Sequence, residues 1–325
     1  MLLKGEHCEP RQHSISPVDN IPDTPPGLMK RANKGKMSFS IEKILDHFGL
    51  FKRPFSLAPD PEFLFLSEAH QRAKSALEYG LVARSPITLV TGEIGAGKTL
   101  LLRDFMNHIE EDVRIGLVAN ASPADRTEML RLILYALDQV PPEGDSYATY
   151  YAALETFLVE EYRQGRRVVL IFDEAQNLDW SSLEHLRMLT NINFAEHELL
   201  QLMLIGQSEL RDMIMRPDLR QLAQRVSASM HLPGLTHEDV GHYITHRLNL
   251  AGAGRQIFDD TTCDLIHVTT GGTPRLINQL CDYALLYAYA EGETVVTAEA
   301  VQAVTEDGVL LVAHGHQAAH QRAAE

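Results

Sequence analysis

The chain of 325 residues is long enough to bury a large core in one or two domains, and its 45% hydrophobic and 22% charged residues are ordinary for a globular protein. Its formal net charge of −15 argues against a protein that coats nucleic acid by bulk attraction, although it leaves room for a local basic patch. The three cysteines, Cys8, Cys263 and Cys281, form no C-x-x-C pattern, which indicates a reducing compartment and no structural zinc. The sequence has no apolar run near the length of a membrane span and no apolar leader, so we expect a cytoplasmic protein, with the surface of the inner membrane as the alternative location.

The N-terminal part of the chain divides into two stretches. Residues 1–36 are rich in Pro, His, Ser and Asp, show no period and predict a disordered tail, which makes Met37 a candidate start of the folded chain. Residues 37–85 predict a linker segment with a helix near Ile41–Phe48 and a second helix over about Ser67–Val82. The position of this segment just ahead of a glycine-rich loop makes a nucleotide base one candidate neighbour and ordinary core packing the other.

The glycine-rich loop carries the strongest motif in the chain. The apolar run Ile87–Val90 leads into Gly92–Thr99, which matches G-x-x-x-x-G-K-[ST] between a strand-like and a helix-like stretch. Its glycines let the backbone approach a polyphosphate, and the successive N–H groups and the helix N-terminus form an anion site. Lys98 is placed to reach the β- and γ-phosphates, and Thr99 offers a hydroxyl to Mg²⁺. A chance glycine-rich turn is the alternative, and the strand–loop–helix context argues against it. The predicted nucleotide-binding residues of this motif are Gly92, Glu93, Ile94, Gly95, Ala96, Gly97, Lys98, Thr99 and Leu100.

Strands and helices alternate over residues 86–233. This alternation predicts a doubly wound α/β domain with a parallel sheet. One run, Val168–Phe172, is continuously apolar, as in a strand that is buried on both faces, and Val226–Leu232 alternates as in a half-exposed edge strand. The other expected elements are strands near Val113–Val118 and Leu199–Ile205, and helices near Leu101–Ile109, Ala124–Val140 and Ser146–Arg163.

Helical periods then replace strands over residues 234–306. These residues predict a smaller all-α domain, and residues 307–325 lose any pattern and predict a C-terminal tail. The expected helices are Thr236–Leu250, Asp259–Val268, Thr273–Ala290 and Thr297–Val304.

Two carboxylates follow the buried apolar run. Asp173 and Glu174 therefore lie at the carboxyl edge of the predicted sheet, where ligands of open α/β folds bind. We expect Asp173 to hold Mg²⁺ together with Thr99, and Glu174 to activate an attacking water. The alternative is that Asp173 and Glu174 only cap the next helix. Gln207, which follows the next strand at the same edge, is a candidate to bond the water or the γ-phosphate, or an ordinary polar residue at a strand end.

Three arginines are candidates to neutralise phosphate charge. Arg220 and Arg225 precede the predicted edge strand, and either is placed to serve a neighbouring subunit's ATP as an arginine finger, with Arg225 preferred and a local ion pair as the alternative. Arg275 lies in the first turn of a helix that Thr273 caps and Pro274 starts. A cation is unfavourable there against the helix dipole, so a bound phosphate would explain it, whereas a solvated arginine would simply tolerate the penalty.

Together these residues resemble an AAA+ ATPase. The Walker A motif corresponds to Gly92–Thr99 and the Walker B motif to Val168–Glu174, with Gln207 at a sensor-1-like, Arg225 at an arginine-finger and Arg275 at a sensor-2-like position. The resemblance implies a sheet in the order 5-1-4-3-2 followed by a helical lid, with ATP and Mg²⁺ as ligands and nucleotide binding coupled to self-association.

More narrowly, the chain resembles the ExeA/GspA family of secretion-associated ATPases and its relatives near exosortase gene clusters. The resemblance spans about residues 39–305, and its matching words are Pro54-Phe55, Pro59–Leu64, Asp173–Leu178, Gly206–Leu210 and Gly271–Asn278. Secretion proteins of this family often carry a transmembrane segment and a peptidoglycan-binding domain after the ATPase, whereas this sequence ends shortly after the expected lid and predicts a stand-alone ATPase.

Three functions follow from these motifs and this resemblance. The first is a Mg²⁺-dependent ATPase that couples its nucleotide state to self-association and to a protein partner in secretion or envelope polysaccharide assembly. The second is a DNA transposition helper that binds duplex DNA when ATP is bound, a class that the same ATPase core resembles and that the acidic composition disfavours. The third is a nucleotide-gated adaptor with negligible turnover.

Overall fold

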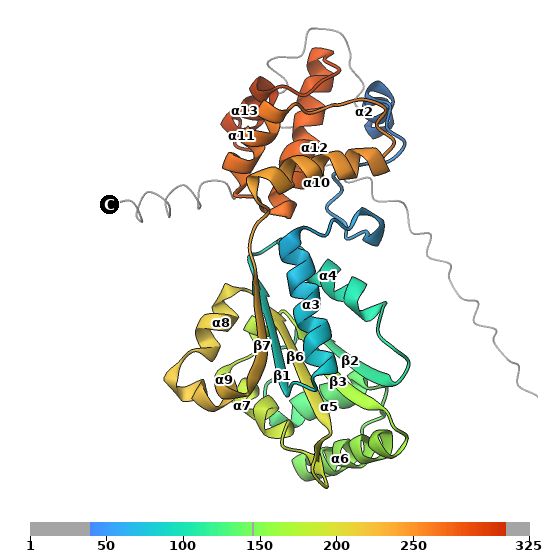
Figure 1. Ribbon diagram of the computed structural model, residues 1–325, viewed down its shortest axis with the longest axis vertical. Helices are drawn as coiled ribbons and strands as arrows, with labels where there is room; N and C mark the ends of the chain where they lie inside the picture. The colour runs from blue at the N-terminus through green and yellow to red at the C-terminus, as the bar shows by residue number, and fades with distance from the viewer. Residues whose placement is uncertain (1–39, 145, 310–325) are drawn as a thin grey trace, which may run out of the picture.

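The computed structural model describes residues 40–144 and 146–309. The predicted tail at 1–36 and all but the first residues of the predicted tail at 307–325 lie outside this part. The described chain forms a core built on a sheet and a helical lid above it (Figure 1). In the ranges that the structure describes, no helix is long and apolar enough to cross a membrane.

A five-stranded, all-parallel sheet forms the centre of the core. The strand order is β2-β3-β6-β1-β7, which in chain order of these five strands, read from the β7 edge, is the predicted 5-1-4-3-2. Two further short strands, β4 (Asn193–Phe194) and β5 (His197–Glu198), form a separate antiparallel hairpin that the sequence did not predict. The strands of the main sheet are β1 (Ile87–Gly92), β2 (Val113–Ala119), β3 (Arg167–Asp173), β6 (Leu200–Gly206) and β7 (Val226–Leu232).

Helices cover both faces of the sheet. Alternate residues of the central strands enter two separate apolar clusters, one on each face, which explains why β3 reads as a continuous apolar run. α3 (Glu68–Val82) and α4 (Lys98–Met106) cover one face. The opposite face is covered by α5 (Arg126–Ala136), α6 (Tyr147–Arg163), α7 (Trp180–Leu189), α8 (Ser208–Ile214) and α9 (Arg220–Arg225).

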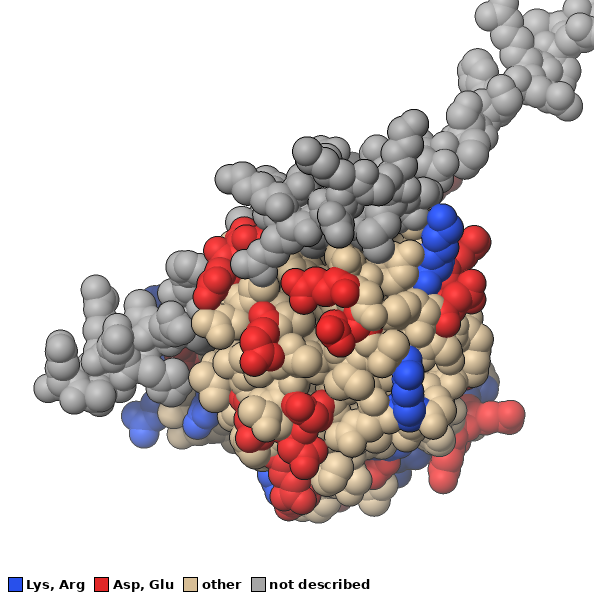
Figure 2. All heavy atoms as spheres, turned by 90° about the horizontal axis from the view of Figure 1, so that it is seen from above, with Lys and Arg blue, Asp and Glu red and all other residues tan. Residues whose placement is uncertain are grey.

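The lid has its own apolar core. Its four C-terminal helices agree with the sequence prediction to within a few residues: α10 (His237–Leu250), α11 (Asp260–Thr270), α12 (Pro274–Glu291) and α13 (Ala298–Glu306). On the face seen from above, most of the charged side chains are acidic, on a surface that is largely uncharged (Figure 2). The exposed acids of the lid include Glu42, Asp46, Glu291, Glu293, Glu299 and Glu306.

The described part of the segment expected as a linker packs partly on the lid and partly on the core. Helix α2 (Ile41–Phe48) packs on the lid, where Phe48, Leu50 and Phe55 are buried among lid residues. The Phe55 ring meets the Phe258 ring edge-on at 5.8 Å between centroids. The chain then crosses to the core, where α3 packs on the sheet, and it returns to the lid after β7 (Figure 1). The lid is therefore built from both ends of the folded chain.

Polar side chains at the helix starts explain several of these boundaries. Ser67 accepts a hydrogen bond from the backbone N–H of His70 at the start of α3. Asp125, Asp179 and Thr236 cap α5, α7 and α10 in the same way. Such caps satisfy backbone donors that have no partner within the helix.

Candidate active site

The loop Gly92–Thr99 joins β1 to α4 with the backbone expected of a phosphate cradle. Gly95 and Gly97 have φ angles of 79° and 95°, a region that residues with a Cβ rarely adopt. A Cβ on Gly95 would lie 2.6 Å from the Cβ of Arg275, because the lid approaches the loop at this point. The loop therefore requires glycine for its conformation and for its closeness to the lid.

Lys98 is the first residue of α4 and is buried. Its Nζ donates hydrogen bonds to the carbonyls of Gly92 at 2.8 Å and Glu93 at 2.9 Å, so the ammonium lies inside the loop. Burial lowers the pKa of Lys98, and the nearby carboxylates of Glu174 and Asp173 oppose that shift. The geometry gives a cation enclosed by the loop that is to receive the phosphates.

Thr99 and Asp173, which the sequence predicts as ligands of Mg²⁺, are hydrogen-bonded to each other across the site. The Thr99 Oγ1 donates to the Asp173 Oδ2 at 3.0 Å, and Asp173 lies at the carboxyl end of β3. Burial raises the pKa of Asp173, and the Thr99 hydrogen bond acts in the opposite direction. A hydroxyl and a carboxylate at this spacing suit a Mg²⁺ that also binds substrate phosphates and water. Among the described residues no group of three or more His, Cys, Asp or Glu is arranged to hold a metal, so the remaining ligands would be phosphates and waters.

Glu174 directly follows the strand and has a φ of 57°. Its carboxylate is held by two amides: the Nε2 of Gln176 donates to its Oε2 at 2.5 Å, and the Nε2 of Gln207 at 3.3 Å. The Oε1 of Gln176 accepts the backbone N–H of Gln207 at 3.0 Å. Glu174 and Gln207, which were predicted at one sheet edge, thus lie in one network. Gln176 is a further member that was not among the predicted site residues, although it stands in the word Asp173–Leu178.

The first turn of α3 also contacts the loop, and no pattern in the sequence indicates this contact. The Nε2 of His70 lies 3.0 Å from the carbonyl of Ala96, and its Nδ1 lies 2.7 Å from the Oγ of Ser67. Because a carbonyl only accepts, Nε2 carries the proton and the Ser67 hydroxyl donates to Nδ1. Burial lowers the pKa of His70, which is consistent with this neutral ring. α3 therefore also holds the loop in place.

Arg275 borders the same loop from the lid. Its backbone N–H donates to the carbonyl of Gly95 at 3.3 Å, and its side chain lines a cavity of about 270 Å³ between the loop, the residues Ser56–Asp60 and the lid. Lys98, Thr99, Glu174 and Gln207 line the same cavity. Within the described ranges no carboxylate lies within ion-pair distance of the Arg275 guanidinium, so its charge is available to a ligand in this cavity.

The two candidate finger arginines differ in their surroundings. The guanidinium of Arg225 bonds within its own chain, to the Thr190 hydroxyl at 2.5 Å and to the side-chain oxygen of Asn191. Arg220 is exposed at the start of α9, and no described residue offers it a hydrogen bond or an ion pair. The structure therefore gives no support to our preference for Arg225 and leaves Arg220 as the freer side chain.

Comparison with known proteins agrees with this geometry. Residues 83–214 match the family described as AAA domain. The chain is 40% identical over 246 residues to general secretion pathway protein A of Aeromonas hydrophila, a match that covers 75% of this chain and 45% of that protein. The chain thus spans less than half the length of this relative.

Solved structures with the same fold have low sequence identity. The Drosophila ORC bound to DNA matches with a TM-score of 0.61 at 15% identity, over 91% of this chain and 70% of that chain. The ADP form of the Aeropyrum pernix ORC2 protein matches with a TM-score of 0.55 at 19% identity, over 78% and 72% of the two chains. At such identities the likeness shows the fold alone. The resemblance inferred from the sequence is confirmed: the chain is an AAA+ P-loop NTPase related to general secretion pathway protein A.

Proposed function

We propose that the protein binds and hydrolyses ATP in a Mg²⁺-dependent manner and couples its nucleotide state to self-association and to a protein partner in secretion or envelope polysaccharide assembly. The observation that carries this proposal is the grouping of Lys98, Thr99, Asp173, Glu174 and Gln207 at one edge of the sheet. This set supplies positive charge, metal ligands, a base and a polar orienting group, which phosphoryl transfer to water requires.

Each side chain has a separate role in the proposed reaction. The loop N–H groups and Lys98 bind the phosphates, and Arg275 adds charge from the lid. Mg²⁺, held by Thr99 and Asp173, would neutralise charge on the phosphate oxygens. Glu174 accepts the proton of the attacking water, and the amides of Gln176 and Gln207 hold its carboxylate in place.

The base of the nucleotide would lie beside the chain segment that enters the core. Ser56–Asp60 line the cavity, which continues into a small apolar pocket bordered by Phe63, Phe65 and Tyr243. This position supports a contact between the segment before the loop and the nucleotide base, which was one of its two candidate roles beside ordinary core packing. Because lid residues line both pockets, the affinity for the nucleotide would also depend on the position of the lid.

The decisive experiment measures phosphate release with and without Mg²⁺ over a range of protein concentrations. We expect activity per protomer to rise with concentration, because an arginine from a neighbouring subunit would complete the site. Glu174→Gln should retain ATP binding and lose turnover by roughly a hundredfold or more. Lys98→Ala should lose both, and Glu155→Gln, an exposed glutamate of α6, should change neither.

Two results would contradict the proposal. A protein that binds ATP but releases no phosphate at any concentration would be a nucleotide-gated adaptor. Salt-sensitive binding to duplex DNA that requires ATP would favour the transposition helper. The secretion partner is inferred from the name of one relative, and purification of the protein with its bound partners in the presence of ATP tests that part independently.

A further inference from the structure

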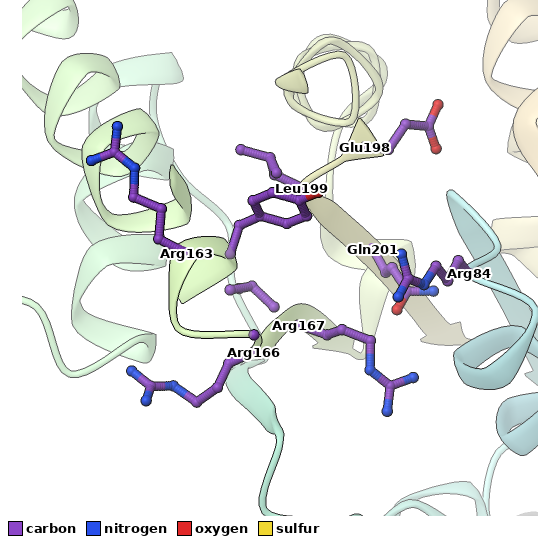
Figure 3. Close-up of a pocket in the computed structure, with 10 residues that line it drawn as sticks. Arg84, Arg163, Arg166, Arg167, Glu198, Leu199 and Gln201 are labelled. Atoms are coloured by element: carbon purple, nitrogen blue, oxygen red, sulfur yellow. The ribbon is translucent and has the colours of Figure 1, made fainter. Parts of the chain in front are cut away.

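The polar side chains of the nucleotide cavity are buried and connected, unlike those of the cavity shown in Figure 3. That second cavity, of about 390 Å³, opens where β3 and β6 begin. Its residues Arg163, Arg166 and Arg167 point in different directions in this view (Figure 3). Arg166 is already paired with Glu161, and Arg167 with Asp112. At the nucleotide cavity, by contrast, three side chains from two lid helices form one hydrogen-bonded chain.

The first member of this chain, Arg247 of α10, is a buried cation without a carboxylate partner among the described residues. It is 5% exposed and borders both the nucleotide cavity and the apolar pocket beside it. Its Nε donates to the carbonyl of Pro54 at 2.5 Å, its Nη1 to the hydroxyl of Tyr243 at 2.9 Å, and its Nη2 to the carbonyl of Ser56 at 3.5 Å. Arg247 therefore holds the segment before the loop and Tyr243 at the same time.

The bond from Arg247 decides the direction of the next bond in the chain. Because a guanidinium only donates, the Tyr243 hydroxyl accepts from it and gives its own proton to Oδ1 of Asn278, at 2.8 Å. Burial raises the pKa of Tyr243, although the charge of Arg247 opposes this, so the hydroxyl keeps the proton that it donates. Oδ1 of Asn278 is thus fixed as an acceptor, and the orientation of the amide follows.

The amide nitrogen of Asn278 remains as a donor at the cavity. Asn278 lines the cavity and is 7% exposed, and no described residue accepts a hydrogen bond from its Nδ2. In the part of the chain that the structure describes, the side-chain polar atoms that are sealed from solvent without a partner belong to His185, Gln201 and His246. The Nδ2 of Asn278 is therefore accessible, and a ligand in the cavity can reach it.

Asn278 lies one helical turn beyond Arg275 on the same face of α12. The backbone N–H of Arg275 contacts the phosphate loop at Gly95, and three residues advance the helix by about 4.5 Å. A nucleotide whose phosphates contact the loop and Arg275 would therefore place its nucleoside beside Asn278. Tyr243, which bonds to Asn278, also borders the apolar pocket that suits an aromatic base.

We propose that Asn278 recognises the nucleotide base by donating a hydrogen bond from Nδ2 to a ring nitrogen of the purine. Arg247 and Tyr243 act as positioning residues, because they hold the amide with its nitrogen towards the ligand. The unsubstituted ring nitrogens of adenine are acceptors, so they match a donor in this orientation. This inference rests on the proposed binding of ATP and adds to it the residue that selects the base.

The test compares ATP with 1-deaza-ATP, 3-deaza-ATP and 7-deaza-ATP, in which one ring nitrogen is replaced by C–H. Calorimetric titration of the full chain with Mg²⁺, in the Glu174→Gln background, measures affinity without turnover. One of the three analogues should bind roughly tenfold more weakly than ATP, because the donor of Asn278 loses its acceptor.

Three further variants assign this penalty to its residue. Asn278→Asp replaces the donor by a carboxylate oxygen and should abolish the difference between ATP and that analogue. Tyr243→Phe removes the hydroxyl that orients the amide and should reduce the difference. The matched control is Asn249→Asp, on an exposed asparagine of α10 that does not line the nucleotide cavity, and it should keep the full difference.

The proposal is overturned if all three analogues bind as tightly as ATP, or if the penalty is unchanged in Asn278→Asp. It is also overturned if 2′-deoxy-ATP alone shows a penalty that depends on Asn278, since the amide would then contact the ribose. If Tyr243→Phe loses affinity for inorganic triphosphate as much as for ATP, Tyr243 supports the fold and does not position the amide. Phosphate release is a separate assay: turnover without the penalty contradicts only base recognition, and the penalty without turnover contradicts only hydrolysis.

Discussion

Glu174 shows how the proposed base is held in position. Its backbone is in the left-handed region, and two glutamine amides contact one of its carboxylate oxygens. Gln176 bonds to Glu174 with one end of its amide and to the backbone of Gln207 with the other. It therefore fixes the distance between the base and the end of β6.

Gln176 is accordingly expected to act as a positioning residue. Gln176→Ala should lower kcat by about tenfold to a hundredfold and leave the KM for ATP nearly unchanged, since a small displacement of the base affects the chemical step alone. Gln164→Ala is the matched control. Gln164 is exposed, and its side chain makes one hydrogen bond among the described residues, to the carboxylate of Glu160. Equal losses in kcat and ATP affinity would argue against a positioning role.

His185 predicts a pH dependence of stability that is independent of the site. It is fully buried on α7, its Nε2 lies 3.0 Å from the Tyr147 hydroxyl, and no described residue contacts its Nδ1 with a hydrogen bond. Burial, with a smaller contribution from Arg126, lowers its pKa from 6.5 to about 4. The unfolded chain therefore binds a proton before the folded chain does, and this contribution to stability is lost as the pH falls from 6.5 towards 4.

We expect this histidine to remove about 2 kcal/mol of unfolding free energy between about pH 7 and pH 5. Denaturant unfolding at the two pH values measures the change. His185→Leu should lower the stability at neutral pH but reduce the difference between the two values. His108→Gln, which alters an exposed histidine, should leave that difference as in the unmodified protein. An unchanged pH difference in His185→Leu would assign the effect to other groups.

At the scale of elements, α3 connects the two ends of the sheet. Its first turn holds the phosphate loop through His70, and near its last turn the carbonyl of Gly80 accepts from Gln201. Gly80 also packs so closely on β1 that a Cβ there would lie 2.0 Å from the Oγ1 of Thr88. The contact of Gly80 with the Thr88 side chain at this point sets the depth of the helix on the sheet.

Gly80→Ala is expected to destabilise the protein although alanine favours a helix. Gly241, inside α10, gives a matched comparison, because a Cβ there would meet no atom within 4 Å. Gly241→Ala should stabilise by about 0.5–1 kcal/mol, whereas Gly80→Ala should lower the melting temperature. Thermal unfolding of both variants measures this, and a stabilised Gly80→Ala would show that the helix shifts at little cost.

The sequence predicted those elements and site residues that depend on local patterns. The phosphate loop, the buried strand before Asp173 and the helices of the lid follow from residue type and spacing within a few neighbours. The partners of Arg225 could not be predicted from the sequence, because Thr190 and Asn191 approach it only when α7 and α9 pack together. The same holds for the residues before Leu57, whose burial depends on lid helices about 200 residues further along the chain.

At the scale of the whole molecule, the surface charge bears on partners. Most of the charged side chains on the lid face in Figure 2 are acidic and would repel nucleic acid phosphates. We expect any self-association to use the exposed side of α8 and α9, because an arginine finger must reach the neighbouring subunit from there. Arg220 is free there, whereas Arg225 stabilises the contact between α7 and α9.

We therefore expect the two arginine variants to differ, one in ATP turnover and the other in melting temperature. Arg220→Ala should keep its melting temperature and ATP affinity but lose roughly a thousandfold in ATP turnover. Arg225→Ala should mainly lower the melting temperature. Mixing Arg220→Ala with Glu174→Gln should restore part of the activity, since some interfaces would then combine an intact base with an intact arginine. The absence of recovery would place the arginine and the base in the same protomer's site.

The division of the lid between the two ends of the folded chain has a consequence for synthesis. As the chain leaves the ribosome, Phe48, Leu50 and Phe55 emerge long before the helices that bury them. These apolar side chains must stay in water, or on a chaperone, while the whole core is translated and folds. Fragments that end after β7 should therefore aggregate more readily than fragments that end there and also start after Phe55. In the whole chain, helices α10 to α13 bury these side chains and remove them from recognition by chaperones and proteases.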